Sequence, residues 1–156
     1  MKAHVIRMLR AMAWADAESL AALRDCQAAW PEALGLYAHM LAAEHVWLSR
    51  LEGRAPTRAV WPALSIPECE SLSAENAAGY ATYIDKLPET DLATVIRYRN
   101  SQGEEFANTV LDILTHVVIH GAYHRGQIAK AIGRAGGQSA STDYIIFARS
   151  VERKPE

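Results

Sequence analysis

The chain of 156 residues is 50% hydrophobic and carries 16 basic and 18 acidic residues, for a formal net charge of -2. This length suits one domain with a full core, so we expect a single domain over residues 1–156. The charges form no basic stripe that would follow a phosphate backbone, so no nucleic-acid partner is expected. No stretch reaches the ~18 continuous apolar residues of a membrane span, so we expect no membrane partner and a cytoplasmic location.

Hydrophobic residues recur at helical spacing over residues 2–27, which predicts a first amphipathic helix. Pro31 can occupy the first turn of a second helix, which we expect to end at residues 52–53. Residues 53–70 contain three prolines and no sustained period. They predict a long connection of the kind that helical bundles use between parallel neighbours.

Ser71 or Ser73 can cap a short third helix that ends before residues 87–88. Residues 95–108 then alternate around a turn-like centre, which predicts a small β-hairpin. Thr109 starts a capping-box pattern, and a periodic apolar run continues from it to residues 136–137, which predicts a long last helix. The fold class is therefore all-α, with a small β-hairpin before the last long helix. The segment after this helix reads as a short strand or a helical turn, and its sequence does not decide between the two.

The last long helix carries His116, His120 and His124 at a spacing of four. A step of four residues keeps all three within one sector of about 80° on a helix. Because His116 and His124 are ~12 Å apart along the axis, all three cannot bind one ion through Zn–N bonds of about 2.1 Å. The candidate pairs are His116 with His120 or His120 with His124, and a further ligand must come from another element.

The second helix offers His39 and His45. His39 shares the apolar face of this helix, whereas His45 lies about 120° round, toward the polar side, so we choose His39 and expect His45 at the surface. A buried imidazole without a partner costs roughly 1–3 kcal/mol, and a shared metal ion would satisfy three rings at once. Taken alone, a histidine on an apolar face is more often a hydrogen-bonded core residue than a ligand.

The motifs of two common metalloprotein classes are missing. No HExxH pattern is present, because Gly121, Ala122 and Tyr123 separate the last two histidines, which disfavours zinc-protease chemistry. Paired Glu-x-x-His motifs are also missing, which disfavours ferritin-like di-iron chemistry. Neutral imidazoles without a carboxylate suit zinc, nickel or iron(II), and the ligand type does not settle which.

Two segments, "LYAHMLAAEHVWLSRLEG" and "LTHVVIHGAYHRGQI", together with "MAWADAESL" near the start and "STDYIIFAR" near the end, occur in an order that resembles the DinB-like (DinB/YfiT-like) metal-binding four-helix-bundle family. The resemblance implies an up-down-down-up bundle, often a homodimer, with a three-histidine divalent metal site in a cleft. It implies His39, His120 and His124 as the ligands, with zinc or nickel as the favoured ion and iron as another candidate. Ile119 departs from the family pattern, which usually has Asn before the ligand.

The residues beside the histidine motif have predicted roles of their own. We expect His116 to support the ligands or to form a core hydrogen bond, and Gln127 to hydrogen-bond a ligand ring. Tyr123 and Arg125 are expected either to contact substrate or to extend along the end of the bundle. No catalytic acid or base is identified.

We also predict the surroundings of two glycines and one aspartate. Gly121 and Gly126 cost up to ~1 kcal/mol each in a helix, so we expect another helix to pack closely on them. Asp16 matches the family pattern on the first helix and is expected either in solvent or facing the cleft.

The resemblance leaves two kinds of function. In the first, three protein ligands leave a coordination position open, and the protein is a metal-dependent transferase that acts on a small molecule with a low-molecular-weight thiol. In the second, it is a non-catalytic metal-binding or stress-related bundle; a metal-dependent hydrolase is a further alternative. The sequence identifies neither a substrate nor the native metal.

Overall fold

A computed structural model describes residues 1–100 and 102–152 of the chain. These residues are mostly helical, and two short strands form an antiparallel hairpin before the last long helix, which confirms the predicted helical class and its hairpin. The helices are α1 (Lys2–Asp25), α2 (Trp30–Leu51), α3 (Ile66–Lys86), α4 (Val110–Arg134) and α5 (Tyr144–Glu152), with 3-10 turns η1 (Gln27–Ala29) and η2 (Glu89–Ala93) and strands β1 (Val95–Arg99) and β2 (Glu105–Thr109).

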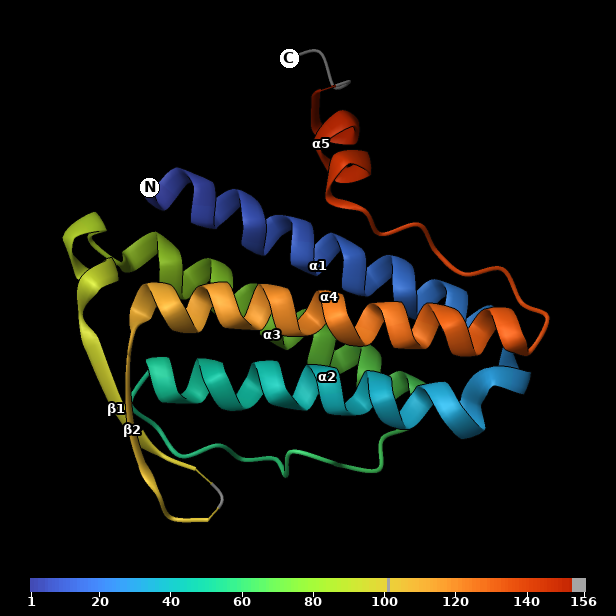
Figure 1. Cartoon of the computed structure of the whole chain (residues 1–156), viewed down its shortest axis with the longest axis horizontal. Helices are drawn as coiled ribbons and strands as arrows, with labels where there is room; N and C mark the ends of the chain where they lie inside the picture. The colour runs from blue at the N-terminus through green and yellow to red at the C-terminus, as the bar shows by residue number, and fades with distance from the viewer. Residues whose placement is uncertain (101, 153–156) are drawn as a thin grey trace.

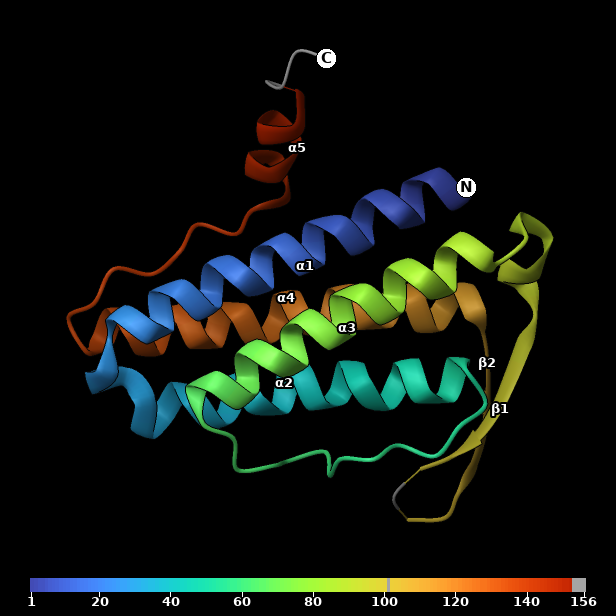
Figure 2. The same ribbon diagram turned by 180° about the vertical axis from the view of Figure 1, so that it is seen from behind.

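The four long helices lie side by side, and α1 and α2 each pack against both α3 and α4 (Figures 1 and 2). Their hydrophobic side chains form two buried clusters. Tyr37 belongs to the first cluster and Tyr80 to the second, and both side chains are almost fully buried. Between the clusters lies a layer of four buried polar side chains, one from near the middle of each long helix: Asp16, Glu44, Asn76 and Arg125.

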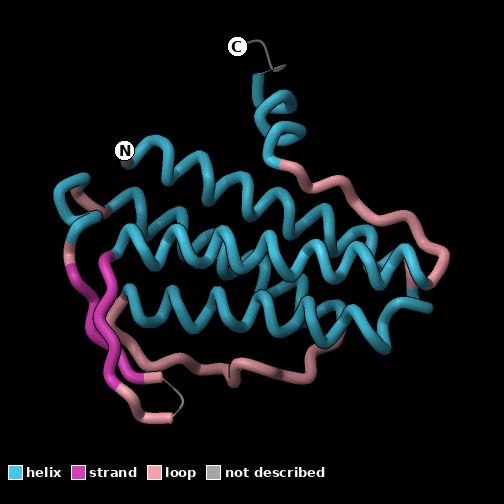
Figure 3. The backbone as a smooth tube through the Cα atoms, in the orientation of Figure 1, coloured by secondary structure: helices cyan, strands magenta, loops and turns pink. Residues whose placement is uncertain are grey.

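The third helix begins earlier than the sequence predicted. The prediction of a cap at Ser71 or Ser73 was wrong, because Ser65 caps α3 through a capping box with Glu68. Pro67 occupies the first turn of α3, where a missing backbone N–H costs nothing. The connection from α2 therefore covers residues 52–65, and it runs along the outside of α2 (Figure 3).

The start of α4 agrees with the sequence. Thr109 accepts a hydrogen bond from the backbone N–H of Asp112, and the Asp112 carboxylate accepts one from the backbone N–H of Thr109. The last residue of β2 is therefore also the N-cap of α4. This shared residue fixes the hairpin against the end of the bundle at which α4 begins.

The segment after α4 ends in a helix, α5, so the choice that the sequence left open is resolved in favour of helix. Phe147 of α5 contacts Trp14 of α1, with ring centroids 5.8 Å apart. The α5 helix therefore adjoins α1, away from the 52–65 connection (Figure 1). Within the described part of the chain, no helix is long and apolar enough to cross a membrane.

Candidate metal centre

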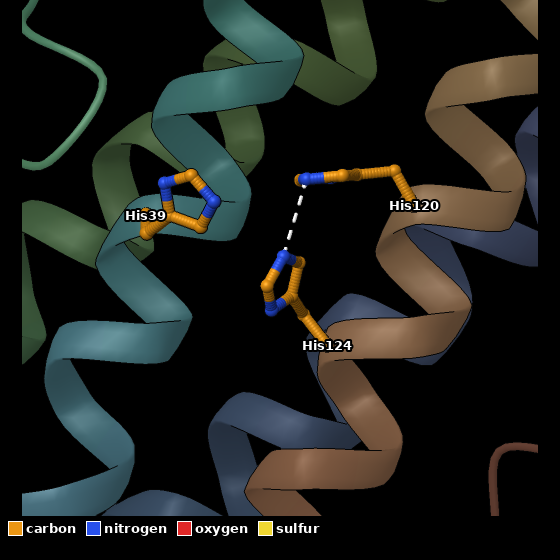
Figure 4. A group of neighbouring side chains, drawn as sticks. All are labelled: His39, His120 and His124. Atoms are coloured by element: carbon orange, nitrogen blue, oxygen red, sulfur yellow. Dashed lines mark hydrogen bonds between the residues drawn. The ribbon is translucent and has the colours of Figure 1, made fainter.

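Three histidine side chains from two helices converge on one point. His39 comes from α2, and His120 and His124 come from α4, which packs against it (Figure 4). One ring nitrogen from each lies within 4.8 Å of the others. The Nε2 atoms of His120 and His124 are 3.2 Å apart, close to the roughly 3.4 Å that separates two nitrogens on a tetrahedral ion with Zn–N bonds of ~2.1 Å.

In two of these histidines the Nδ1 atom, which points away from the group, has a hydrogen-bond partner. Its contact leaves the Nε2 atom of the same ring available to bind a metal ion. His39 Nδ1 lies 2.8 Å from the carbonyl oxygen of Val60. His124 Nδ1 lies 2.8 Å from Oε1 of Gln127, so the hydrogen bond expected between Gln127 and a ligand ring is present. Both oxygens can only accept, so each Nδ1 must carry the proton and each Nε2 must hold a lone pair. Outer partners of this kind are typical of metal-binding histidines.

Burial keeps the two rings on α4 in their neutral form. Burial, together with the neighbouring histidines, lowers the pKa of His120 to about 4. Burial also lowers the pKa of His124, against the opposing effect of its hydrogen bond to Gln127. A metal-bound imidazole must be neutral, so neither ring has to release a net proton to bind a divalent ion near neutral pH. The donor set and its protonation therefore fit a divalent ion.

The 52–65 connection covers one side of the histidine group. Trp61 stacks on the His39 ring, with centroids 3.7 Å apart and planes 7° from parallel. Together with the Val60 carbonyl, this indole holds the ring of His39 in a single orientation. Neither contact could be predicted from the sequence, because a backbone carbonyl in a proline-rich segment carries no sequence signal and Trp61 follows no helical period.

A cleft of about 1050 Å³ opens beside the histidines. His39 and His120 form part of its wall, and it extends along α2 toward β1 between Trp47, Trp61 and Tyr98. A ligand in this cleft could therefore reach an ion held by the three histidines. A closed structural metal site would not need such a space.

The other candidates beside the motif lie in different places. His116 does not join the histidine group; its ring lies against Trp47, at 5.0 Å between centroids, and 5.4 Å from that of His120. Tyr123 is exposed and contacts the edge of the His124 ring. Arg125 is buried and donates a hydrogen bond of 2.7 Å to Asp16 in the interior. Asp16 and Arg125 therefore lie neither in solvent nor on the wall of this cleft, so the expectation for Asp16 was wrong.

The prediction that His45 lies at the surface was wrong. Only 7% of its surface is exposed, and its Nε2 accepts a hydrogen bond from the backbone N–H of Thr57. The 52–65 connection covers this side of α2, which helical periodicity alone had assigned to solvent. His45 therefore anchors the connection, while His39 points into the group with His120 and His124.

The chain is similar to known proteins over most of its length. Residues 4–155 match the DinB family. The chain is also similar to Protein DinB of Bacillus subtilis (strain 168), with 26% identity over 133 residues that cover 80% of this chain and 76% of the relative. No solved structure gives a significant match. Because the match spans nearly the whole chain, this protein belongs to the DinB family.

Proposed function

We propose that the protein is an enzyme that binds one divalent metal ion through His39, His120 and His124 and transfers a low-molecular-weight thiol to a small electrophilic substrate. The observation that carries the proposal is the cleft of about 1050 Å³ beside the three histidines. When bound, an ion with three imidazole ligands has an open coordination position and lowers the pKa of a thiol or water molecule there.

The surrounding residues have separate parts in this function. Gln127 orients the ring of His124 by accepting a hydrogen bond from its Nδ1–H, and the Val60 carbonyl orients the ring of His39 in the same way. Trp61 and Trp47 supply flat apolar walls against which the body of a substrate can lie. Tyr123, at the exposed edge of His124, is proposed to contact the substrate as it enters.

The proposal includes the architecture and assembly expected for this family. The 52–65 connection runs along the bundle, which supports an up-down-down-up order of the long helices. The homodimer, the cytoplasmic location, and zinc or nickel as the native ion are parts of the same proposal. A hydrolase would use the same open position with water in place of a thiol.

The metal site is tested by elemental analysis of the purified protein and of its single His→Ala variants. We expect about one ion per chain in the wild type and a large loss of metal in His39→Ala, His120→Ala and His124→Ala. His45→Ala and His116→Ala should retain the ion, and each is a matched control on the same helix as a proposed ligand. A ligand variant with full metal content would remove that residue from the site.

The chemistry is tested with the cobalt-substituted protein. A small thiol that binds the ion should give a sulfur-to-cobalt charge-transfer band, and thiol consumption should accelerate when an electrophile is added. A band without turnover would favour the non-catalytic alternative. Turnover with water but without thiol would favour the hydrolase.

A further inference from the structure

The cleft beside the histidines is lined by basic side chains although the whole chain has a net charge of -2. None of the described residues that line it is an aspartate or a glutamate. Five of them are arginines: Arg50, Arg54, Arg58, Arg97 and Arg99. Such a wall favours an anionic ligand and disfavours a cationic one.

Three of these arginines already have carboxylate partners. Arg54 pairs with Glu52, Arg99 pairs with Glu105, and Arg58 lies 3.9 Å from Glu75. Arg97 is exposed on β1 and, like Arg50, makes no ion pair within the described part of the chain. Arg50 differs from the other four because its side chain is half-buried against aromatic rings. Its guanidinium lies 4.3 Å from the ring centroid of Trp47 and 4.4 Å from that of Tyr98.

The guanidinium of Arg50 has donors to spare. One Nη2 hydrogen bond goes to the carbonyl oxygen of Arg99, at 3.3 Å, out of five N–H donors on the group. Burial lowers the pKa of Arg50, so the cation is partly removed from water without a counter-charge. Two aromatic rings fix the plane of the group, which suits a planar, bidentate carboxylate.

Arg50 faces the same side of α2 as the metal ligand. Eleven residues separate His39 from Arg50, which corresponds to three turns plus about 20°, and to roughly 16 Å along the axis. The side chain of Arg50 extends back over Trp47, one turn nearer the histidines, and shortens this gap. A ligand that contacts both the ion and Arg50 must therefore be elongated.

We propose that the cleft binds an elongated, carboxylate-bearing small molecule whose far carboxylate pairs with Arg50 while its reacting group lies at the three histidines. The inference rests on the proposed function, because it assigns the substrate class of the same site. Arg50 binds and positions this molecule through its carboxylate, and Trp47 and Tyr98 hold the guanidinium in place.

The test uses S-methylglutathione, which has the length and the carboxylates but no free thiol, and its dimethyl ester, in which both carboxylates are blocked. Isothermal titration to the metal-loaded protein should show binding of the acid, with at least tenfold weaker binding of the ester. Arg50→Met should weaken binding of the acid by about the same factor, and Arg50→Lys should lie between, because lysine keeps the charge but loses the bidentate geometry.

Arg149→Met is the matched control, since it removes the same charge from an exposed site on α5, which adjoins α1, away from the 52–65 connection. It should bind the acid as the wild type does. Three results would each overturn the inference. The first is equal binding of the acid and the ester, and the second is no binding by the wild type. The third is equal binding of the acid by the wild type and by Arg50→Met, with unchanged helicity and metal content.

Experiments on the same proteins distinguish a failure of this inference from a failure of the proposed function. Glutathione added to the cobalt form reports sulfur coordination, whereas S-methylglutathione reports the carboxylate site alone. Arg50-dependent binding of S-methylglutathione without a sulfur-to-cobalt band for glutathione would support the anion site and reject the thiol chemistry. A band for glutathione that is insensitive to Arg50→Met would support the thiol chemistry and reject the anion site.

Discussion

Arg125 of α4 donates a hydrogen bond of 2.7 Å to Asp16 of α1, and both side chains are almost fully buried. Glu44 and Asn76 complete this polar layer, with 3.2 Å between the Asn76 amide nitrogen and the Glu44 carboxylate. The layer separates the two hydrophobic clusters and draws one side chain from each long helix. A slip of any helix along its axis would unpair a buried polar group, so the layer specifies how the four helices align.

Gly121 provides the space for this layer. A Cβ at this position would lie 2.7 Å from Nη1 of Arg125, whereas a Cβ at Gly126 would meet no atom within 4 Å. The expectation of another helix packed closely on Gly126 was therefore wrong, because Gly126 faces open space. At Gly121 the space is filled by Arg125 of the same helix and by Glu44 of α2, whose Oε1 would lie 3.6 Å from the added Cβ.

Gly121→Ala should lower the free energy of unfolding by up to about 2 kcal/mol. The added Cβ forces Nη1 of Arg125 away from its place beside Asp16. Overpacking of this kind costs about 1–3 kcal/mol, and the better helix propensity of alanine offsets about 1 kcal/mol. Gly126→Ala on the same helix should instead raise stability by up to about 1 kcal/mol. Urea unfolding of the two variants measures the difference, and equal stability would reject the proposed role of Gly121.

The two buried carboxyl groups give the second prediction. Burial raises the pKa of Asp16 to about 6, against the opposing charge of Arg125. Burial and the charge of Asp16 raise the pKa of Glu44 well above its ordinary value. A carboxyl group with a raised pKa in the folded state stabilises the fold at low pH, and this contribution falls as pH rises.

Glu44→Gln should therefore gain stability relative to the wild type as pH rises from about 5 to 7, by up to about 1.4 kcal/mol per pH unit. Glutamine keeps the shape of the protonated acid and has no charge to desolvate. Urea unfolding at several pH values gives the difference, in which the titration of the histidines cancels. Glu18→Gln, at an exposed site on α1, should show no such trend. A pH-independent difference for Glu44→Gln would contradict a neutral Glu44.

Sequence periodicity predicted α1, α2 and α4 because each has a continuous apolar face and a recognisable end. It missed about the first two turns of α3, because Pro67 lies in a proline-rich stretch that resembles a loop as much as a helix start. Spacing narrowed the histidines of α4 to two candidate pairs, His116 with His120 or His120 with His124, and the family resemblance selected the second. Gln127 lies one turn from His124. These relationships are local, so the sequence carries them.

The remaining contacts join segments that are far apart in the chain. Asp16 and Arg125 are 109 positions apart, and nothing local to either residue indicates the other. The burial of His45 also depends on where the 52–65 connection lies, which periodicity cannot report. Long-range pairing and loop placement are therefore the parts of the fold that only the structure supplies.

Gln127 allows a test of the outer contacts of the proposed metal site. Gln127→Leu removes the acceptor for Nδ1–H of His124, and we expect metal affinity to fall by about 10–100-fold. Gln127→Glu keeps an acceptor and should retain or increase affinity. Competition with a chromogenic chelator measures all three proteins, and wild-type affinity in Gln127→Leu would show that this hydrogen bond does not support the ligand.

The last prediction concerns the 52–65 connection, whose contacts with α2 include His39. The ring of His39 hydrogen-bonds to the Val60 carbonyl and stacks on Trp61. Each contact contributes about 0.5–1.5 kcal/mol, so their loss in His39→Ala should increase local opening of the connection by roughly tenfold. Trypsin can cut this segment after Arg54 and Arg58, and the rate of that cut reports the opening.

All proteins are compared after chelation, so that loss of a metal ion does not contribute to the difference. His116→Ala is the control, since its ring lies against Trp47 and contacts no part of the connection that the structure describes. Trp61→Ala should share part of the increase, because it removes the stack but leaves the hydrogen bond to Val60. If His39→Ala is cut no faster than His116→Ala, the ring of His39 does not hold the connection. The orientation of this ring would then have to come from α2 alone.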